Sequence, residues 1–149
     1  MPRCEGVSPD IKALALRLRD AFEEISPYIE HYTSHVCPSC DRVCCIDRHG
    51  THELEDLAFI EVIGESPSPL PPLEDDTLPC RHLSQMGCSI ERWRRPYRCT
   101  WYFCSALLHE MPAMDKRKYR EFMHKLRELT DAREAFVRAL RDIEDAEDD

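Results

Sequence analysis

Apolar residues recur at helical spacing near both ends of the chain, and this pattern is lost in the middle. Near the N-terminus, steps of three or four residues keep one face of a helix apolar, with Ile11, Leu14, Leu18, Phe22 and Ile25. Ser8, Pro9 and Asp10 form a typical helix start, because they suit the cap, the first turn and the positive end of the helix dipole. Proline disfavours helical geometry at the residue before it, so Pro27 predicts the end of this helix at residue 26.

A second amphipathic helix is predicted over residues 115–143. Its apolar stripe comprises Tyr119, Phe122, Met123, Leu126, Leu129, Phe136, Val137, Leu140 and Ile143. A break near Thr130-Asp131 is one possibility within it. Residues 144–149 form an acidic tail that we expect to fray. The stripe is expected to pack on the first helix rather than to form a groove for a partner.

The central part of the chain has no such periodicity. Residues 30–50 are predicted to be an irregular loop, and residues 51–63 to begin as a helix, although 58–63 could equally be a strand. Five prolines between residues 65 and 79 predict an extended linker. The expected fold is therefore mainly α: one helix-rich domain over 1–149, with helical flanks at 8–26 and 115–143 around an irregular, cysteine-clustered metal-binding region at 37–104.

Composition and charge narrow the class of protein. The chain has 149 residues and a formal net charge of -9, with 42% hydrophobic and 33% charged residues, as expected of one globular domain. This net charge makes nucleic acid an unexpected partner. The first residues do not resemble a signal peptide, and no run of eighteen apolar residues predicts a membrane span. We therefore expect a cytoplasmic location, and the sequence leaves protein partners and oligomeric state open.

Nine cysteines are the main chemical signal, because disulfides are rare in the reducing cytosol. Eight of them fall in two clusters: Cys37, Cys40, Cys44 and Cys45, then Cys80, Cys88, Cys99 and Cys104. Two thiolates separated by two residues can bind one ion from a tight loop. We therefore predict that thiolates from both clusters bind metal and that metal binding contributes to folding.

Eight thiolates exceed one tetrahedral site, so two mononuclear sites, one binuclear site or an iron–sulfur cluster with spare thiols remain open. Zinc is the favoured metal, with iron or an iron–sulfur cluster as the alternative. His35, His82 or His109 could replace a thiolate, and Cys4 lies outside both clusters. Disulfides, buried free thiols and a catalytic cysteine are the less favoured explanations of the cysteine pattern.

Four arginines alternate with Trp93 and Tyr97 between Cys88 and Cys99. This loop could bind nucleic acid or phosphate. We favour a supporting role, since a zinc ion with four thiolates carries two net negative charges and needs cationic neighbours. Arg95 and Arg98 are the predicted neighbours.

The same residues resemble a known family. The set Cys37-x2-Cys40-x3-Cys44-Cys45, Cys80-x-x-Leu83, Gly87-Cys88-Ser89-Ile90, Arg95-Pro96-x-x-Cys99 and Cys104 resembles the YkgJ-like cysteine-cluster family, also called CxxCxxCC. Here three residues, rather than two, precede the double cysteine. The resemblance covers residues 37–104 and implies a zinc- or iron-chelating domain with these eight cysteines as the metal-associated set.

Three functions follow as hypotheses. The first is a binding module whose metal is structural. The second is a metalloenzyme with an open metal site or an iron–sulfur redox protein. The third is metal storage or delivery. The sequence indicates a cofactor and no substrate, so it leaves open whether the protein is an enzyme and which residues would be catalytic.

Overall fold

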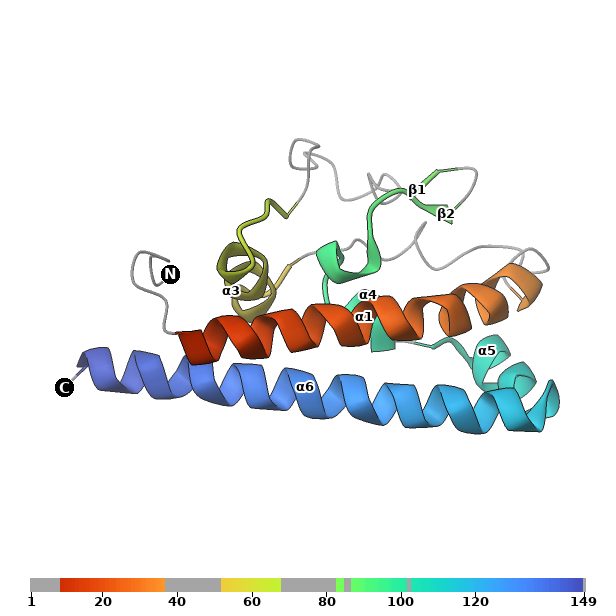
Figure 1. The fold of residues 1–149 in the computed structure, drawn as a ribbon. Coiled ribbons are helices and arrows are strands. Elements are labelled where there is room, and N and C mark those ends of the chain that lie inside the picture. The colour runs from red at the N-terminus through yellow and green to blue at the C-terminus, as the bar shows by residue number, and fades with distance from the viewer. Residues whose placement is uncertain (1–8, 37–51, 68–82, 85–86, 102, 149) are drawn as a thin grey trace.

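Two long helices lie side by side and run in opposite directions in the computed structural model (Figure 1). They are α1 (Pro9–Val36) and α6 (Lys116–Asp148). The structure describes residues 9–36, 52–67, 83–84, 87–101 and 103–148. The mainly α fold and the helical flanks are thereby confirmed, and the packing of the second helix on the first is as expected.

The hydrophobic core lies along the facing sides of α1 and α6 and continues beneath the short helices. Its largest fully buried apolar or aromatic side chains are Tyr32, Phe22, Phe122, Phe136, Leu18, Ile25, Ile60 and Leu129. Aromatic rings meet edge to face within it, as between Tyr32 and Phe122, whose centroids are 5.3 Å apart. The stripes predicted from the sequence supply most of this core, because helical spacing places them on one face.

Pro27 does not end the first helix, so the predicted end at residue 26 is wrong. The helix α1 contains Pro27 and continues to Val36. Proline in a helix interior costs about 3 kcal/mol through the lost hydrogen bond and the clash with the preceding turn. The continuation buries Ile29, Tyr32 and Val36 against the core, and burial of such side chains contributes about 1.5–3 kcal/mol each. Tertiary packing therefore outweighs the local preference of proline.

The C-terminal helix is longer than predicted and has no break at Thr130-Asp131. The helix α6 runs to Asp148, through most of the acidic tail that was expected to fray. The Thr130 hydroxyl donates to the Leu126 carbonyl at 2.9 Å, so it is satisfied without interrupting the helix. Leu129 and Ala132 are buried on either side of this point, which holds it in the packed stripe.

The helix α3 (Leu54–Val62) lies across one side of the antiparallel pair formed by α1 and α6, called the helical hairpin below (Figure 1). Residues 58–62 are therefore helix and not strand. The Glu53 backbone N–H donates to the Asp56 carboxylate at 2.9 Å, one half of a capping box. Gly64 follows with φ 80°, a conformation that glycine adopts without strain. Ala58, Phe59 and Ile60 are buried against the core.

The other described elements are short. The strands β1 (Leu83–Ser84) and β2 (Gly87–Cys88) pair antiparallel, with Leu83 opposite Cys88 and Ser84 opposite Gly87. They are followed by the 3₁₀ helix η2 (Arg92–Arg94), by α4 (Arg98–Trp101) and α5 (Ser105–Glu110), and by the 3₁₀ helix η3 (Met111–Ala113). Among the described residues no helix is both long enough and apolar enough to cross a bilayer.

Candidate functional site

Three of the eight clustered cysteines are described, and each belongs to a different short element. Cys88 ends β2, Cys99 lies in α4, and Cys104 is the N-cap residue of α5. Cys88 and Cys104 are half-buried, whereas Cys99 is exposed, and these three form no disulfide with one another. The other predicted ligands, Cys37, Cys40, Cys44, Cys45 and Cys80, lie outside the described residues, as does Cys4.

Thiols are donors that zinc and iron share, so the chemistry of these three side chains fits the predicted metals. Within the described part of the chain, no three His, Cys, Asp or Glu side chains lie close enough to hold a metal ion. The predicted ligand set stays a prediction.

The histidines considered as substitute ligands differ in their surroundings. His35 is exposed in the last turn of α1, with its Nδ1 2.6 Å from the His31 carbonyl oxygen. His109 is 78% exposed and lies 3.8 Å from the Glu110 carboxylate. His82 lies outside the described residues. The geometry favours neither described histidine as a ligand.

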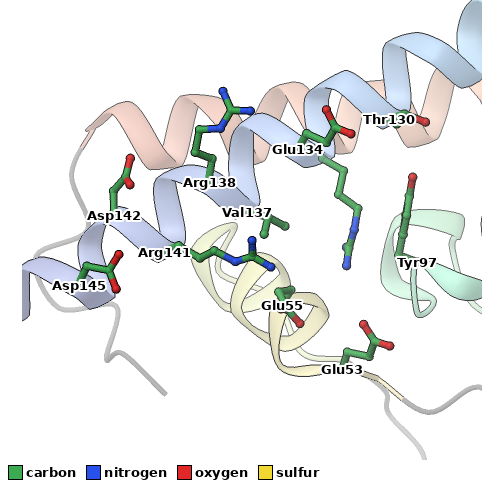
Figure 2. A pocket seen from close by; sticks show the side chains of 11 residues that line it. Glu53, Glu55, Tyr97, Thr130, Glu134, Val137, Arg138, Arg141, Asp142 and Asp145 are labelled. Atoms are coloured by element: carbon green, nitrogen blue, oxygen red, sulfur yellow. The ribbon is translucent and has the colours of Figure 1, made fainter. Parts of the chain in front are cut away.

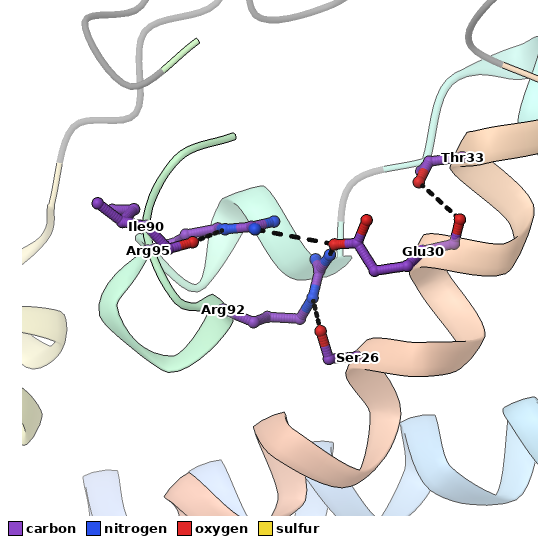
Figure 3. A network of polar contacts seen from close by, with 6 residues as sticks. All are labelled: Ser26, Glu30, Thr33, Ile90, Arg92 and Arg95. Atoms are coloured by element: carbon purple, nitrogen blue, oxygen red, sulfur yellow. Dashed lines mark hydrogen bonds and ion pairs between the residues drawn. The ribbon is translucent and has the colours of Figure 1, made fainter. Parts of the chain in front are cut away.

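Arg92 lies between Cys88 and Cys99 in the sequence and is buried, with 6% of the residue exposed. One of its terminal nitrogens donates to the Glu30 carboxylate at 2.6 Å, and its Nε donates to the Ser26 hydroxyl at 3.0 Å. Figure 3 shows both partners on consecutive turns of α1, facing the arginine. The two hydrogen bonds fix the guanidinium plane and attach η2 to α1.

The pKa of Arg92 is shifted by its burial and by three charged neighbours. Burial lowers the pKa of Arg92, and the neighbouring charge of Arg95 lowers it further. The Glu30 carboxylate raises this pKa, and so does a negative charge on Cys88.

Arg95 belongs to the same network, and its predicted role beside the thiolates stays a prediction. Its Nε donates to the Ile90 carbonyl at 3.0 Å, and a terminal nitrogen lies 3.8 Å from Glu30 (Figure 3). Arg98, the other predicted neighbour of the thiolates, is exposed at the start of α4. The sequence argument missed Arg92. The signal that could have indicated its partners is a polar pair: in a helix that continues through Pro27, Ser26 and Glu30 lie at i, i+4 on one face.

The aromatic residues of this loop pack inward. Trp93 and Tyr97 are partly buried against the core, and the Arg94 guanidinium lies 4.6 Å from the centre of the Trp93 ring. Binding of single-stranded nucleic acid uses exposed aromatic faces. Their packing therefore favours a structural role for these two rings.

Asp56 anchors the far end of the loop and is 4% exposed. Its Oδ1 accepts hydrogen bonds from the Tyr97 backbone N–H and from the Arg133 guanidinium, each at 3.2 Å. The Arg133 guanidinium also lies over the Tyr97 ring, 4.1 Å from its centre. One carboxylate thus links α3, α6 and the residues just before α4.

An open groove of about 700 Å³ lies between α3, Tyr97 and α6 (Figure 2). Its walls carry both signs of charge, from Glu53, Glu55, Arg133, Glu134, Arg138, Arg141, Asp142 and Asp145, together with Tyr97, Thr130 and Val137. Specific small-molecule sites are usually enclosed and mostly apolar. This groove does not identify a class of ligand.

No family model, curated protein or solved structure matches this chain. The resemblance to the YkgJ-like cysteine-cluster family accordingly stays a prediction. The fold and the loop network come from the residues themselves.

Proposed function

We propose that the two cysteine clusters bind zinc, or alternatively iron, and that the metal is mainly structural in a protein that acts as a binding module. The observation that carries this proposal is the burial of Arg92 in the segment that joins Cys88 to Cys99. Arg92 and Arg95 bring two positive charges to a single carboxylate, that of Glu30. Burial of a cation is costly, so the buried Arg92 favours anionic neighbours in addition to Glu30.

Metal-bound thiolates fit that requirement. The Glu30 side chain is 57% exposed, so water screens part of its charge, while the Arg92 side chain is 4% exposed. A cluster of deprotonated cysteines that includes Cys88 would supply further negative charge, and the arginines would in turn stabilise the anionic metal centre. The same arrangement supports iron as well as zinc, since both bind thiolates.

A structural role follows from where the apolar core lies. The core is built from α1, α3, α5, η3 and α6, and of the three described cysteines only Cys104 packs against it. A metal would therefore stabilise the loop region by joining segments that apolar packing connects weakly. The resemblance adds Cys37, Cys40, Cys44, Cys45 and Cys80 to Cys88, Cys99 and Cys104 as the residues that would hold it.

Anaerobic purification of the full chain, followed by elemental analysis and an optical spectrum, separates the possible functions. The proposal predicts bound zinc or iron without acid-labile sulfide. Iron with sulfide and a visible spectrum that bleaches on reduction would favour the redox alternative. Protein without metal, with its cysteines oxidised to disulfides, would refute the proposal.

The substitution Cys40→Ser tests one ligand directly. We expect it to lower both the metal content and the melting temperature, because the metal then joins fewer segments. Most of the helical circular dichroism should persist, since α1 and α6 form much of the core. Cys4→Ser is the matched control, because Cys4 lies outside both clusters. Wild-type metal content in the Cys40→Ser protein would show that Cys40 is not a ligand.

A further inference from the structure

A pair of histidines near the end of α1 carries a further inference, which does not rest on the proposed function. His31 and His35 are four positions apart, so they lie on one face of the helix in consecutive turns. Their ring centres are 4.5 Å apart. We propose that this pair binds a divalent transition-metal ion, such as Ni²⁺ or Zn²⁺, through the Nε2 atoms of both rings.

The hydrogen bond of the His35 ring leaves its outer nitrogen available to a metal. The Nδ1 atom lies 2.6 Å from the His31 carbonyl oxygen, which can only accept. Nδ1 therefore carries the ring proton, and in the neutral imidazole Nε2 keeps its lone pair. The Ser34 hydroxyl donates to the same carbonyl at 2.9 Å and lies 3.3 Å from Nδ1. Metal-binding histidines commonly donate their second nitrogen to a backbone carbonyl in this way, which fixes the tautomer and the ring.

The distance between the two rings also fits chelation. An N–metal distance of about 2.0–2.1 Å and an N–metal–N angle of about 90–110° place the centres of two bound imidazoles about 4.5–5 Å apart. The observed separation of 4.5 Å lies in this range, and the ring planes are tilted by 51°. Two histidines four positions apart on a helix are also the spacing of a known zinc-binding motif. The helix therefore holds both donors near the positions that chelation requires.

This pair is separate from the described part of the cysteine region. His35 is exposed and His31 is half-buried. Among the residues that the structure describes, no group of three His, Cys, Asp or Glu side chains could hold a metal, so Cys88, Cys99 and Cys104 do not join the pair. The inference is limited to two imidazole donors, which suit Ni²⁺, Cu²⁺ and Zn²⁺. It makes neither histidine a substitute for a thiolate.

Nuclear magnetic resonance of the full chain, as purified and at about pH 8 where histidine rings are neutral, tests the ring geometry first. Imidazole nitrogen spectra report which nitrogen of each histidine carries the proton. We expect the proton of His35 on Nδ1, because that atom faces the His31 carbonyl. A proton on Nε2 of His35 would overturn the inference, since no lone pair would then be available there.

Titration of the same protein with Ni²⁺ tests binding, with calorimetry for affinity and the imidazole signals for location. The signals of His31 and His35 should shift or broaden together, because Ni²⁺ is paramagnetic. His31→Gln and His35→Gln should each weaken Ni²⁺ binding by about tenfold or more, because a single donor replaces a chelate of two. His109→Gln removes a histidine that is 78% exposed and should bind Ni²⁺ like the wild type.

The double variant Thr33→His with His35→Gln is the matched control for spacing. It keeps the number of histidines but places two of them two positions apart, where they no longer face each other on the helix. This variant should bind Ni²⁺ as weakly as His35→Gln alone. Wild-type Ni²⁺ affinity in either protein would overturn the inference. So would binding that appears only as the charge-transfer absorption of nickel thiolates, with the two imidazole signals unchanged.

Discussion

Two arginine–carboxylate pairs hold the loop to the helices, and they differ in which partner is shielded. In the pair Arg133–Asp56 the side chains are 13% and 5% exposed, so both charges are largely removed from water. In Arg92–Glu30 the corresponding values are 4% and 57%, so the cation is buried and its carboxylate is not. Asp56 has two further N–H donors, from the Glu53 and Tyr97 backbones. The first pair is satisfied by its surroundings, while the carboxylate of the second is open to water.

Tyr32 is a residue whose titration should be visible in protein stability. It is 1% exposed, and among the described residues its hydroxyl has no hydrogen-bond partner. Burial raises the pKa of Tyr32 above 10.0, with smaller contributions from Tyr119, Asp115 and Tyr28. A raised tyrosine pKa means that the folded state disfavours the phenolate. Its contribution to stability is present in full below pH 10 and is lost as the pH rises through the folded-state pKa.

The substitution Tyr32→Phe should therefore flatten the loss of stability above pH 10. At pH 7 the free energy of unfolding should stay the same or rise by about 1 kcal/mol, because a buried hydroxyl without a partner is removed. Chemical denaturation between pH 7 and 11 measures both effects. Tyr28→Phe is the control, since the Tyr28 hydroxyl donates to exposed Glu121 at 3.3 Å. A Tyr32→Phe protein destabilised by 2 kcal/mol at pH 7 would contradict this interpretation of the hydroxyl.

At the scale of elements, helical periodicity predicted both long helices and misplaced three of their features. Local sterics alone predict that the helix ends before Pro27. Ile29, Tyr32 and Val36 nevertheless continue its apolar face beyond the proline. In α6, Thr130 bonds within the helix and causes no break. The acidic tail is helical to Asp148. Local propensity is a weak guide wherever an apolar face can be buried.

Replacing Pro27, the proline inside α1, should stabilise the protein. Pro27 is exposed within α1, so Pro27→Ala restores a backbone N–H donor without disturbing the core. The free energy of unfolding should rise, by at most about 3 kcal/mol. Glu23→Ala, an exposed substitution one turn earlier in the same helix, is the control and should change it by less than about 0.5 kcal/mol. A decrease for Pro27→Ala in chemical denaturation would show that the proline is needed for the path of α1.

For the molecule as a whole, the helical hairpin and the cysteine region follow different physical rules. The hairpin is held by apolar burial along α1 and α6. The helical spacing of these apolar residues predicts both helices from the sequence. The loop depends on contacts between distant residues, such as Arg92 with Glu30 and Tyr97 with Asp56. No spacing rule reveals such pairs, and so the sequence did not indicate that Arg92 is the buried arginine of this loop.

The central claim is that thiolates from both cysteine clusters share metal. X-ray absorption at the metal edge of the purified full chain tests it most directly, with Cys40→Ser and Cys99→Ser measured beside the wild type. The account predicts a sulfur shell, at about 2.3 Å if the metal is zinc, and loss of sulfur or of metal from substitution in either cluster. A shell of oxygen and nitrogen alone, or a sulfur shell unchanged in both variants, would contradict it.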